Sequence, residues 1–296
     1  MKELAIKVQT DYIEPDQAVV TELVEQLFRD AGQYQGPDQW QWVRSGSSSL
    51  VVLAGDVAVR VGRDAESAVQ IQRTQKLVDN LPSLSFKVPR SLADSCTHSG
   101  VTGTAVERLH GQPHPAEPVD PHLLRDLLGE IHSIPLEDVR PNVAQARAFY
   151  GGSSWYQVLT ERVLPLLSGR VRSEAQDRIE ALAALEAPDH VLNHSDLGGA
   201  NIHWDSGKVV AVLDWDLASE DDPAEDVATL ASWHGWHLAP QIADATTVRR
   251  AEVFRNAFPL MVAGFTVLRE RPESEISRTL DRVRAKLGER DSTPRH

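Results

Sequence analysis

The sequence predicts an α+β protein with a small N-terminal lobe of helices and strands and a larger, mainly helical C-terminal lobe. Two observations support this fold class. β-prone runs concentrate in the first part of the chain, and amphipathic helical patterns dominate after residue 111. A chain of 296 residues is long enough for two lobes. We expect these lobes to comprise residues 1–109 and 110–296.

The first lobe begins with a predicted helix over residues 15–31, where apolar side chains recur at helical spacing. Residues 50–53 and 57–61 are β-prone runs separated by the turn sequence Ala-Gly-Asp. This pattern predicts a β-hairpin. A second helix is expected over residues 65–81. Further strands are expected at residues 86–89 and 101–106.

The second lobe begins with an amphipathic helix over residues 121–134, followed by helices over residues 155–167 and 173–185. Two short β-type runs then occur at residues 191–194 and 209–213. We expect them to form adjacent strands that end together. Helices return from residue 224 to about residue 287, and residues 289–296 are expected to be frayed.

Composition excludes several classes of protein. The single cysteine, Cys96, rules out an intrachain disulfide and a cysteine-rich zinc site. No secretory signal and no apolar run of about 18 residues is evident, so we expect a cytoplasmic protein without a membrane partner. A net charge of −13 without a basic segment argues against nucleic acid. This acidity either favours a cationic partner or only keeps the surface soluble.

The most informative segment is residues 194–201, which read His-Ser-Asp-Leu-Gly-Gly-Ala-Asn after a predicted strand. Asp196 can accept a hydroxyl proton, while Asn201 and Asp214 offer the hard oxygen atoms that Mg²⁺ prefers. Phosphoryl transfer needs an oriented hydroxyl and a metal ion held against nucleotide phosphates. Any one of these residues alone would suit an ordinary turn. Together, at the ends of strands, they predict a phosphoryl-transfer site.

This segment resembles the His-x-Asp-(four residues)-Asn loop of the aminoglycoside phosphotransferase family. Residues 214–216, Asp-Trp-Asp, look like that family's metal-binding segment. Residues 222–228 resemble its Asp-Pro-x-x-Asp-Leu-Ala stretch, and residues 128–135 resemble the helix end before its catalytic region. The resemblance implies a bilobal protein-kinase-like fold, with an antiparallel sheet in the N-terminal lobe. It also implies that Asp196 is the catalytic base and that Asn201 and Asp214 bind Mg²⁺. His194 would brace the loop.

The resemblance also suggests a nucleotide site in the N-terminal lobe, for either ATP or GTP. Its expected phosphate-binding loop contains Ser45, Ser47, Ser48 and Ser49. Arg60 stands where the family has a phosphate-binding lysine, and backbone groups of Glu107 and Leu109 would meet the base. The helix over residues 65–81 lacks the expected partner acid, so Glu66 is the nearest candidate.

The acceptor is expected beside Asp216, Glu220 and Trp233, although helix packing is the simpler role for the tryptophan. The predicted function is a small-molecule kinase that phosphorylates a hydroxyl of an aminoglycoside or related antibiotic. Two alternatives stay open, namely a kinase of a housekeeping metabolite and a non-catalytic nucleotide-binding regulator. Metal-dependent hydrolysis is weaker, because the sequence offers no second metal cluster. A monomer is favoured.

Overall fold

The computed structural model describes residues 15–34, 36–44, 46, 48–113, 119–186 and 188–288. The chain divides into two compact units. Unit 1 comprises Met1–His114, Glu137–Val143 and Ala200–Asp216, and unit 2 comprises Pro115–Leu136, Ala144–Gly199 and Leu217–His296. The predicted lobe boundary after residue 109 stays a prediction. The fraying expected at residues 289–296 lies outside the described residues.

Unit 1 contains a five-stranded antiparallel sheet with the strand order β1-β2-β3-β5-β4. Its strands are β1 (Gln41–Val43), β2 (Ser49–Ala54), β3 (Val57–Gly62), β4 (Cys96–His98) and β5 (Val101–Glu107). The predicted hairpin is confirmed as β2 and β3, whose turn places Gly55 at φ 53°. Glycine adopts this left-handed conformation without the steric cost of a Cβ atom.

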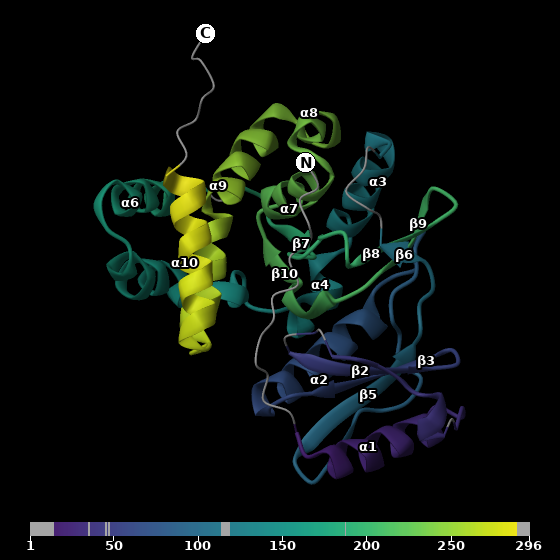
Figure 1. Ribbon diagram of the computed structural model, residues 1–296. Helices are drawn as coiled ribbons and strands as arrows, with labels where there is room; N and C mark the ends of the chain where they lie inside the picture. Colours follow the sequence, from purple (N-terminus) through teal and green to yellow (C-terminus); the bar gives the residue numbers. More distant parts are fainter. Residues whose placement is uncertain are drawn as a thin grey trace. The chain divides into compact units, whose positions relative to one another are not determined.

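Two helices pack on this sheet, α1 (Gln17–Asp30) and α2 (Ala65–Asn80) (Figure 1). Val57, Val59 and Val61 of β3 share the apolar core that contains the buried side chains of α1. Because side chains alternate along a strand, Arg60 belongs to the other face of β3. Gly62, two residues further on that face, packs against the first turn of α2. The sheet thus presents Arg60 on its α2 side.

A second, three-stranded sheet of unit 1 has the order β6-β8-β9, formed by β6 (Gln112–Pro113), β8 (Ile202–Asp205) and β9 (Lys208–Val212). The strand expected at residues 86–89 is reduced to a single bridge, in which Lys87 pairs with Ala211. The short helices η1 (Pro37–Gln39) and η2 (Arg140–Asn142) complete the regular structure wholly within this unit. The helix α4 (Leu136–Val139) begins at the last residue of a unit 2 segment and continues into unit 1.

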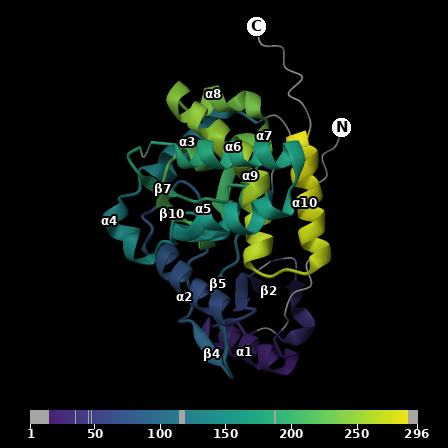
Figure 2. The same cartoon turned by 90° about the vertical axis from the view of Figure 1, so that its left-hand side faces the viewer.

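Unit 2 is mainly helical, as predicted. Its longer helices are α3 (Pro121–His132), α6 (Gly169–Ala183), α7 (Ala224–His234), α9 (Ala245–Leu268) and α10 (Glu273–Gly288), with the short α8 (Ala239–Ile242). Helix α9 packs against α6, α7 and α10, and Figure 2 shows α6, α9 and α10 side by side. By length and composition α9 could also cross a membrane. Its buried side chains, among them Phe254 and Leu260, make it a core helix here.

The remaining elements of unit 2 depart from the predictions. The run at residues 191–194 forms β7 (Val191–Asn193), but it pairs with β10 (Ser219–Asp221) and not with β9. The expected adjacency of the two β-type runs is therefore wrong. The helix expected over residues 155–167 is a chain of short pieces. These are α5 (Trp155–Gln157), a π-helical segment η5 (Val158–Val163) and η6 (Leu164–Leu166).

Candidate active site

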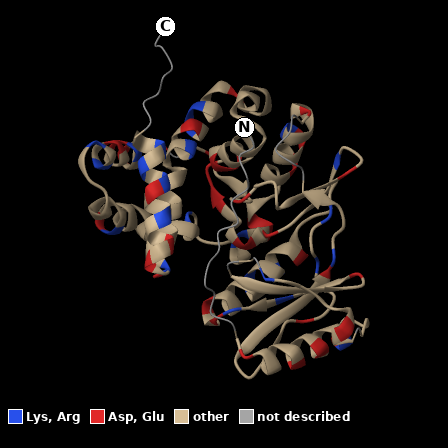
Figure 3. Ribbon diagram, in the orientation of Figure 1, with Lys and Arg blue, Asp and Glu red and all other residues tan. Residues whose placement is uncertain are grey.

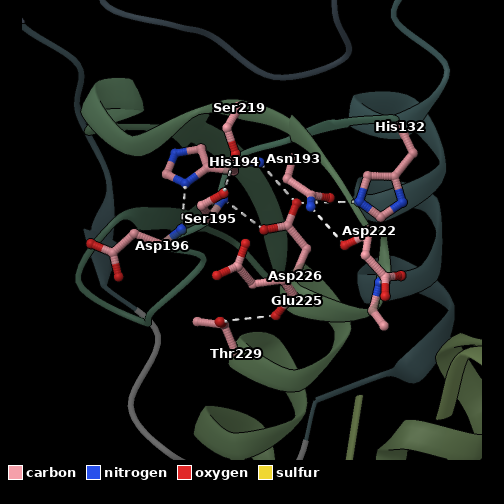
Figure 4. A network of polar contacts seen from close by, with 11 residues as sticks. His132, Asn193, His194, Ser195, Asp196, Ser219, Asp222, Glu225, Asp226 and Thr229 are labelled. Atoms are coloured by element: carbon pink, nitrogen blue, oxygen red, sulfur yellow. Dashed lines mark hydrogen bonds and ion pairs between the residues drawn. The ribbon is translucent and has the colours of Figure 1, made fainter. Parts of the chain in front are cut away.

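The loop after β7 is held by a buried carboxylate on α7. Asp226 is fully buried, and its two oxygens accept the backbone N–H groups of His194 at 2.9 Å and Ser195 at 2.8 Å. Nε2 of His132, at the end of α3, lies 3.2 Å from the same carboxylate (Figure 4). Hydrogen bonds to a charged acceptor are stronger than neutral ones. Asp226 therefore fixes the backbone where the predicted catalytic segment begins.

The backbone turns sharply at the next residue. Ser195 has φ 63°, a left-handed conformation that non-glycine residues rarely adopt and that clusters at functional sites. The backbone N–H of Asp196 then donates to Nδ1 of His194 at 3.3 Å, so this histidine braces the loop as expected. His194 and Leu197 are buried, whereas Asp196 between them is partly exposed. Asp196 is thus partly exposed on a fixed backbone.

The far side of this loop depends on close packing between Gly199 and Trp233. A Cβ atom on Gly199 would lie 1.9 Å from the indole ring of Trp233. This distance is too short for any side chain, so only glycine fits at this position. A Cβ atom on Gly198 would meet only a carboxylate oxygen of Asp196 at 3.7 Å, an ordinary contact. Trp233, a predicted substrate residue on α7, is half-buried and lies against the loop. Its role toward substrate stays a prediction.

Most of the acids after residue 216 are buried, with partners of their own. In unit 2, Asp222 accepts from Nε of Arg250 at 2.9 Å, and Asp221 lies 3.6 Å from Nε of Arg147. Figure 3 colours the acidic residues red along the ribbon. Glu225 is buried, lies near Asp226 in Figure 4, and interacts electrostatically with Asp221 and Asp226. Burial, followed by the charges of these two acids, raises the pKa of Glu225 to about 8. These groups have partners within unit 2 and are poorly placed to steer a cation from solvent. Glu220 on β10 is half-buried and stays a predicted substrate contact.

The two predicted metal ligands belong to unit 1 and are neighbours there. The backbone N–H of Leu213 donates to the carbonyl oxygen of Asn201 at 2.8 Å, so Asn201 lies beside the residue that precedes Asp214. The buried Trp215, whose Nε1 donates to the carbonyl of Val212 at 3.1 Å, fixes the other side. Between these anchors Asp214 has φ 60° and its side chain is 50% exposed.

The electrostatics of Asp214 suit a cation. The neighbouring Asp216 carboxylate disfavours the charged form of Asp214, whereas Arg60 favours it. A bound cation would reduce the electrostatic repulsion between these two neighbouring carboxylates. An amide oxygen and a carboxylate are also the donors that Mg²⁺ prefers. Asn201 and Asp214 therefore fit the predicted ion, although their role as ligands stays a prediction.

Arg60 reaches the same segment from β3. Its Nη2 donates to Oδ2 of Asp216 at 2.7 Å and lies 3.9 Å from Oδ1 of Asp214. Burial tends to lower the pKa of Arg60, but the two acids raise it overall. Burial tends to raise the pKa of Asp216, but Arg60 holds it below its usual value. The carboxylate partner of Arg60 is thus Asp216. The candidate Glu66, which is exposed in the first turn of α2, is not that partner.

The predicted phosphate-binding serines occupy different environments. Ser45 and Ser47 lie outside the described residues, whereas Ser48 precedes β2 and Ser49 is buried within it. Arg63, a residue that the sequence analysis did not single out, holds the backbone at Arg44 and Gly46. Its guanidinium donates to the carbonyl oxygens of Arg44 at 2.9 Å and Gly46 at 3.2 Å.

The predicted base-binding residues lie at the end of β5. The backbone N–H of Glu107 donates to the carbonyl of Arg90 at 2.9 Å, and Leu109 is half-buried in the segment that follows the strand. Both positions are close in sequence to Arg108, whose backbone N–H donates to the carbonyl of Asp56 at 2.8 Å. These two hydrogen bonds fix the backbone of this segment within unit 1. Contact of Glu107 and Leu109 with a base stays a prediction.

Comparison with known proteins decides the family. A sequence profile of the phosphotransferase enzyme family matches residues 39–256, which include the loop with Asp196 and the segment with Asp214. The chain belongs to the phosphotransferase enzyme family. The predicted membership of the aminoglycoside phosphotransferases and their relatives is thus confirmed.

Individual members of the phosphotransferase family resemble this chain over most of its length. Viomycin phosphotransferase of Streptomyces vinaceus is 27% identical over 255 residues, which are 71% of this chain and 86% of that protein. The GDP complex of an aminoglycoside 2'-phosphotransferase-IIIa is 17% identical, with a TM-score of 0.75 and coverage of 93% and 99% of the two chains.

The macrolide 2'-phosphotransferase MphH from Brachybacterium faecium is 18% identical, with a TM-score of 0.67, and the match covers 92% and 99% of the two chains. At these identities the solved structures establish the fold alone. The predicted protein-kinase-like fold is confirmed.

Proposed function

We propose that this phosphotransferase transfers the γ-phosphate of a nucleoside triphosphate to a hydroxyl group of an antibiotic. The observation that carries this proposal is the segment after β7. Its backbone is fixed by the buried Asp226, and Asp196 is partly exposed. A regulator that only binds nucleotide has no need for a carboxylate held in this way.

Asp196 acts as the general base, which accepts the proton of the acceptor hydroxyl. Asn201 and Asp214 hold Mg²⁺, which when bound neutralises charge on the phosphates. Arg60 contacts phosphate oxygens, a task that suits a guanidinium, which is permanently charged. Ser45, Ser47, Ser48 and Ser49 form the loop over the phosphates, and Glu107 and Leu109 meet the base.

The choice of acceptor follows from the relatives. One relative is a viomycin phosphotransferase, and solved structures of similar fold include aminoglycoside and macrolide phosphotransferases. We therefore put viomycin first, then aminoglycosides, then macrolides, with Glu220 and Trp233 as acceptor contacts. The net charge of −13 favours cationic acceptors through long-range attraction. A monomer located in the cytoplasm is part of the same proposal.

Both ATP and GTP are candidate donors. The solved structures of similar fold include complexes with GDP, ADP and ATP. The direct test is therefore a coupled assay of nucleoside diphosphate release with Mg²⁺, each donor in turn and the three antibiotic classes as acceptors. We expect release that depends on the acceptor and stops when EDTA removes the metal. The phosphorylated antibiotic should appear by mass spectrometry.

The outcomes separate the alternatives. Turnover on choline-like metabolites but on none of the antibiotics would favour a housekeeping kinase. Tight binding of Mg²⁺–nucleotide without turnover on any acceptor would favour a nucleotide-binding regulator. Absence of nucleotide binding would contradict the kinase assignment itself.

A further inference from the structure

Helix α2 presents an unusual set of side chains to the segment after β9. Nη2 of Arg73 donates to the carbonyl oxygen of Asp216 at 2.6 Å, and Nε2 of Gln70 lies 3.5 Å from the same oxygen. Positions i, i+3 and i+4 lie on one side of a helix. Two donors on this side of α2 therefore hold the backbone carbonyl of Asp216.

The side chain of Asp216 is directed at Arg60. The bond of 2.7 Å between Nη2 and Oδ2 is a charge-assisted hydrogen bond, and the two side chains are only 14% and 9% exposed. The distance from Arg60 to the half-exposed Asp214 is longer, at 3.9 Å. The acid that orients Arg60 is thus Asp216, while Asp214 faces a more open environment.

Stability alone is a weak reason for this arrangement. The attraction within a buried ion pair is largely offset by the cost of removing both charges from water. Apolar side chains of similar size often stabilise a protein equally well. Arg60 also carries more N–H donors than one carboxylate oxygen uses. A guanidinium has five, and among the described residues the hydrogen bond of Arg60 comes from Nη2. A guanidinium group that is held through one nitrogen can donate its other N–H groups to phosphate oxygens.

We propose that Asp216 is the positioning residue for the phosphate-binding Arg60, and that Arg73 and Gln70 of α2 hold Asp216 in place. Helix α2 thus acts on the phosphate site through an acid on another segment. This inference rests on the proposed function, because it assumes that Arg60 binds nucleotide phosphate. It replaces the predicted role of Asp216 as an acceptor contact.

The test is a double-mutant cycle on Arg60→Gln and Asp216→Asn, with the dissociation constants of Mg²⁺–ATP and Mg²⁺–GTP measured by calorimetry without acceptor. If Asp216 acts through Arg60, we expect each single variant to weaken binding about 10-fold, the effect of losing roughly 1.4 kcal/mol. The double variant should be no weaker than the worse single variant. Equal independent losses would instead multiply to about 100-fold.

A third variant guards against misfolding, because Asp216→Asn leaves the buried Arg60 without its counter-charge. Arg73→Gln keeps both members of the ion pair and removes the bond to the backbone of Asp216 together with a nearby positive charge. We expect it to weaken nucleotide binding several-fold. Arg249→Gln, an arginine of α9 in unit 2, is the matched control and should bind as the wild type does.

The results distinguish this inference from the proposed function. If the wild-type protein binds neither nucleotide, both are wrong. If it binds nucleotide and Asp216→Asn binds equally well, only the role of Asp216 is wrong. An Asp216→Asn variant with unchanged nucleotide binding but a raised KM for the acceptor would return Asp216 to the acceptor site. Independent, multiplying effects in the cycle would also overturn the inference.

Discussion

Several acidic residues of unit 2 are buried, and Glu225 is the clearest example. Its carboxyl group is buried beside Tyr150, Asp221 and Asp226, and its pKa rises from 4.5 to about 8. A neutral carboxyl group is therefore the favoured form of Glu225 in the folded protein over most of the physiological range.

This shift predicts that Glu225→Gln stabilises the protein at high pH. Between pH 4.5 and about 8 the folded state keeps a proton that the unfolded state releases, so the free energy of unfolding falls as pH rises. Glutamine has no such proton. We expect the stability of the variant relative to wild type to increase across this range by about 1.4 kcal/mol or more, measured by urea unfolding. Glu252→Gln, an exposed site on α9, should show no such trend. A relative stability independent of pH would contradict the neutral form.

At the scale of elements, helix α7 contacts the proposed catalytic loop at two places. Asp226 in its first turn accepts the N–H groups at the start of the loop, and Trp233 near its end packs on Gly199. The loop can therefore be displaced by a small change far from the carboxylate of Asp196.

Gly199→Ala is expected to lower kcat/KM by about 100-fold, because displacement of a catalytic group by about 1 Å can have this effect. Gly198→Ala is the matched control and should retain most activity, since its Cβ atom would meet only an ordinary contact at 3.7 Å. Trp233→Leu should partly rescue Gly199→Ala by vacating the space that the new methyl group needs. Equal activities of the two alanine variants would show that the packing of Trp233 does not position the loop.

The elements that could be predicted are those with strong local patterns. The β2–β3 hairpin and helices α1, α2 and α3 follow from periodicity and turn residues. Strand β10 reads Ser-Glu-Asp, which has little β-propensity, and it exists because its backbone pairs with β7. In residues 155–167 apolar spacing could not show the π-helical turn or the break at Pro165. Such elements depend on tertiary contacts.

At the scale of the whole molecule, the same contrast holds for the candidate site. The residues proposed to carry the chemistry, Asp196, Asn201 and Asp214, are predicted from local spacing and from family resemblance. The pairing of Arg60 with Asp216 joins residues 156 positions apart, and the brace from Arg63 acts through backbone carbonyls. No local pattern encodes such contacts, so the sequence pointed to Glu66 instead.

The central claim is that Asp196 is the base of a phosphotransferase, and Asp196→Asn tests it most directly. Asparagine keeps the size of the side chain but accepts a proton poorly. We expect kcat for antibiotic phosphorylation to fall at least about 100-fold, while the dissociation constant for Mg²⁺–nucleotide changes little. Asp205→Asn, an exposed acid at the end of β8, is the control and should keep full activity. An Asp196→Asn variant with wild-type kcat would contradict the account.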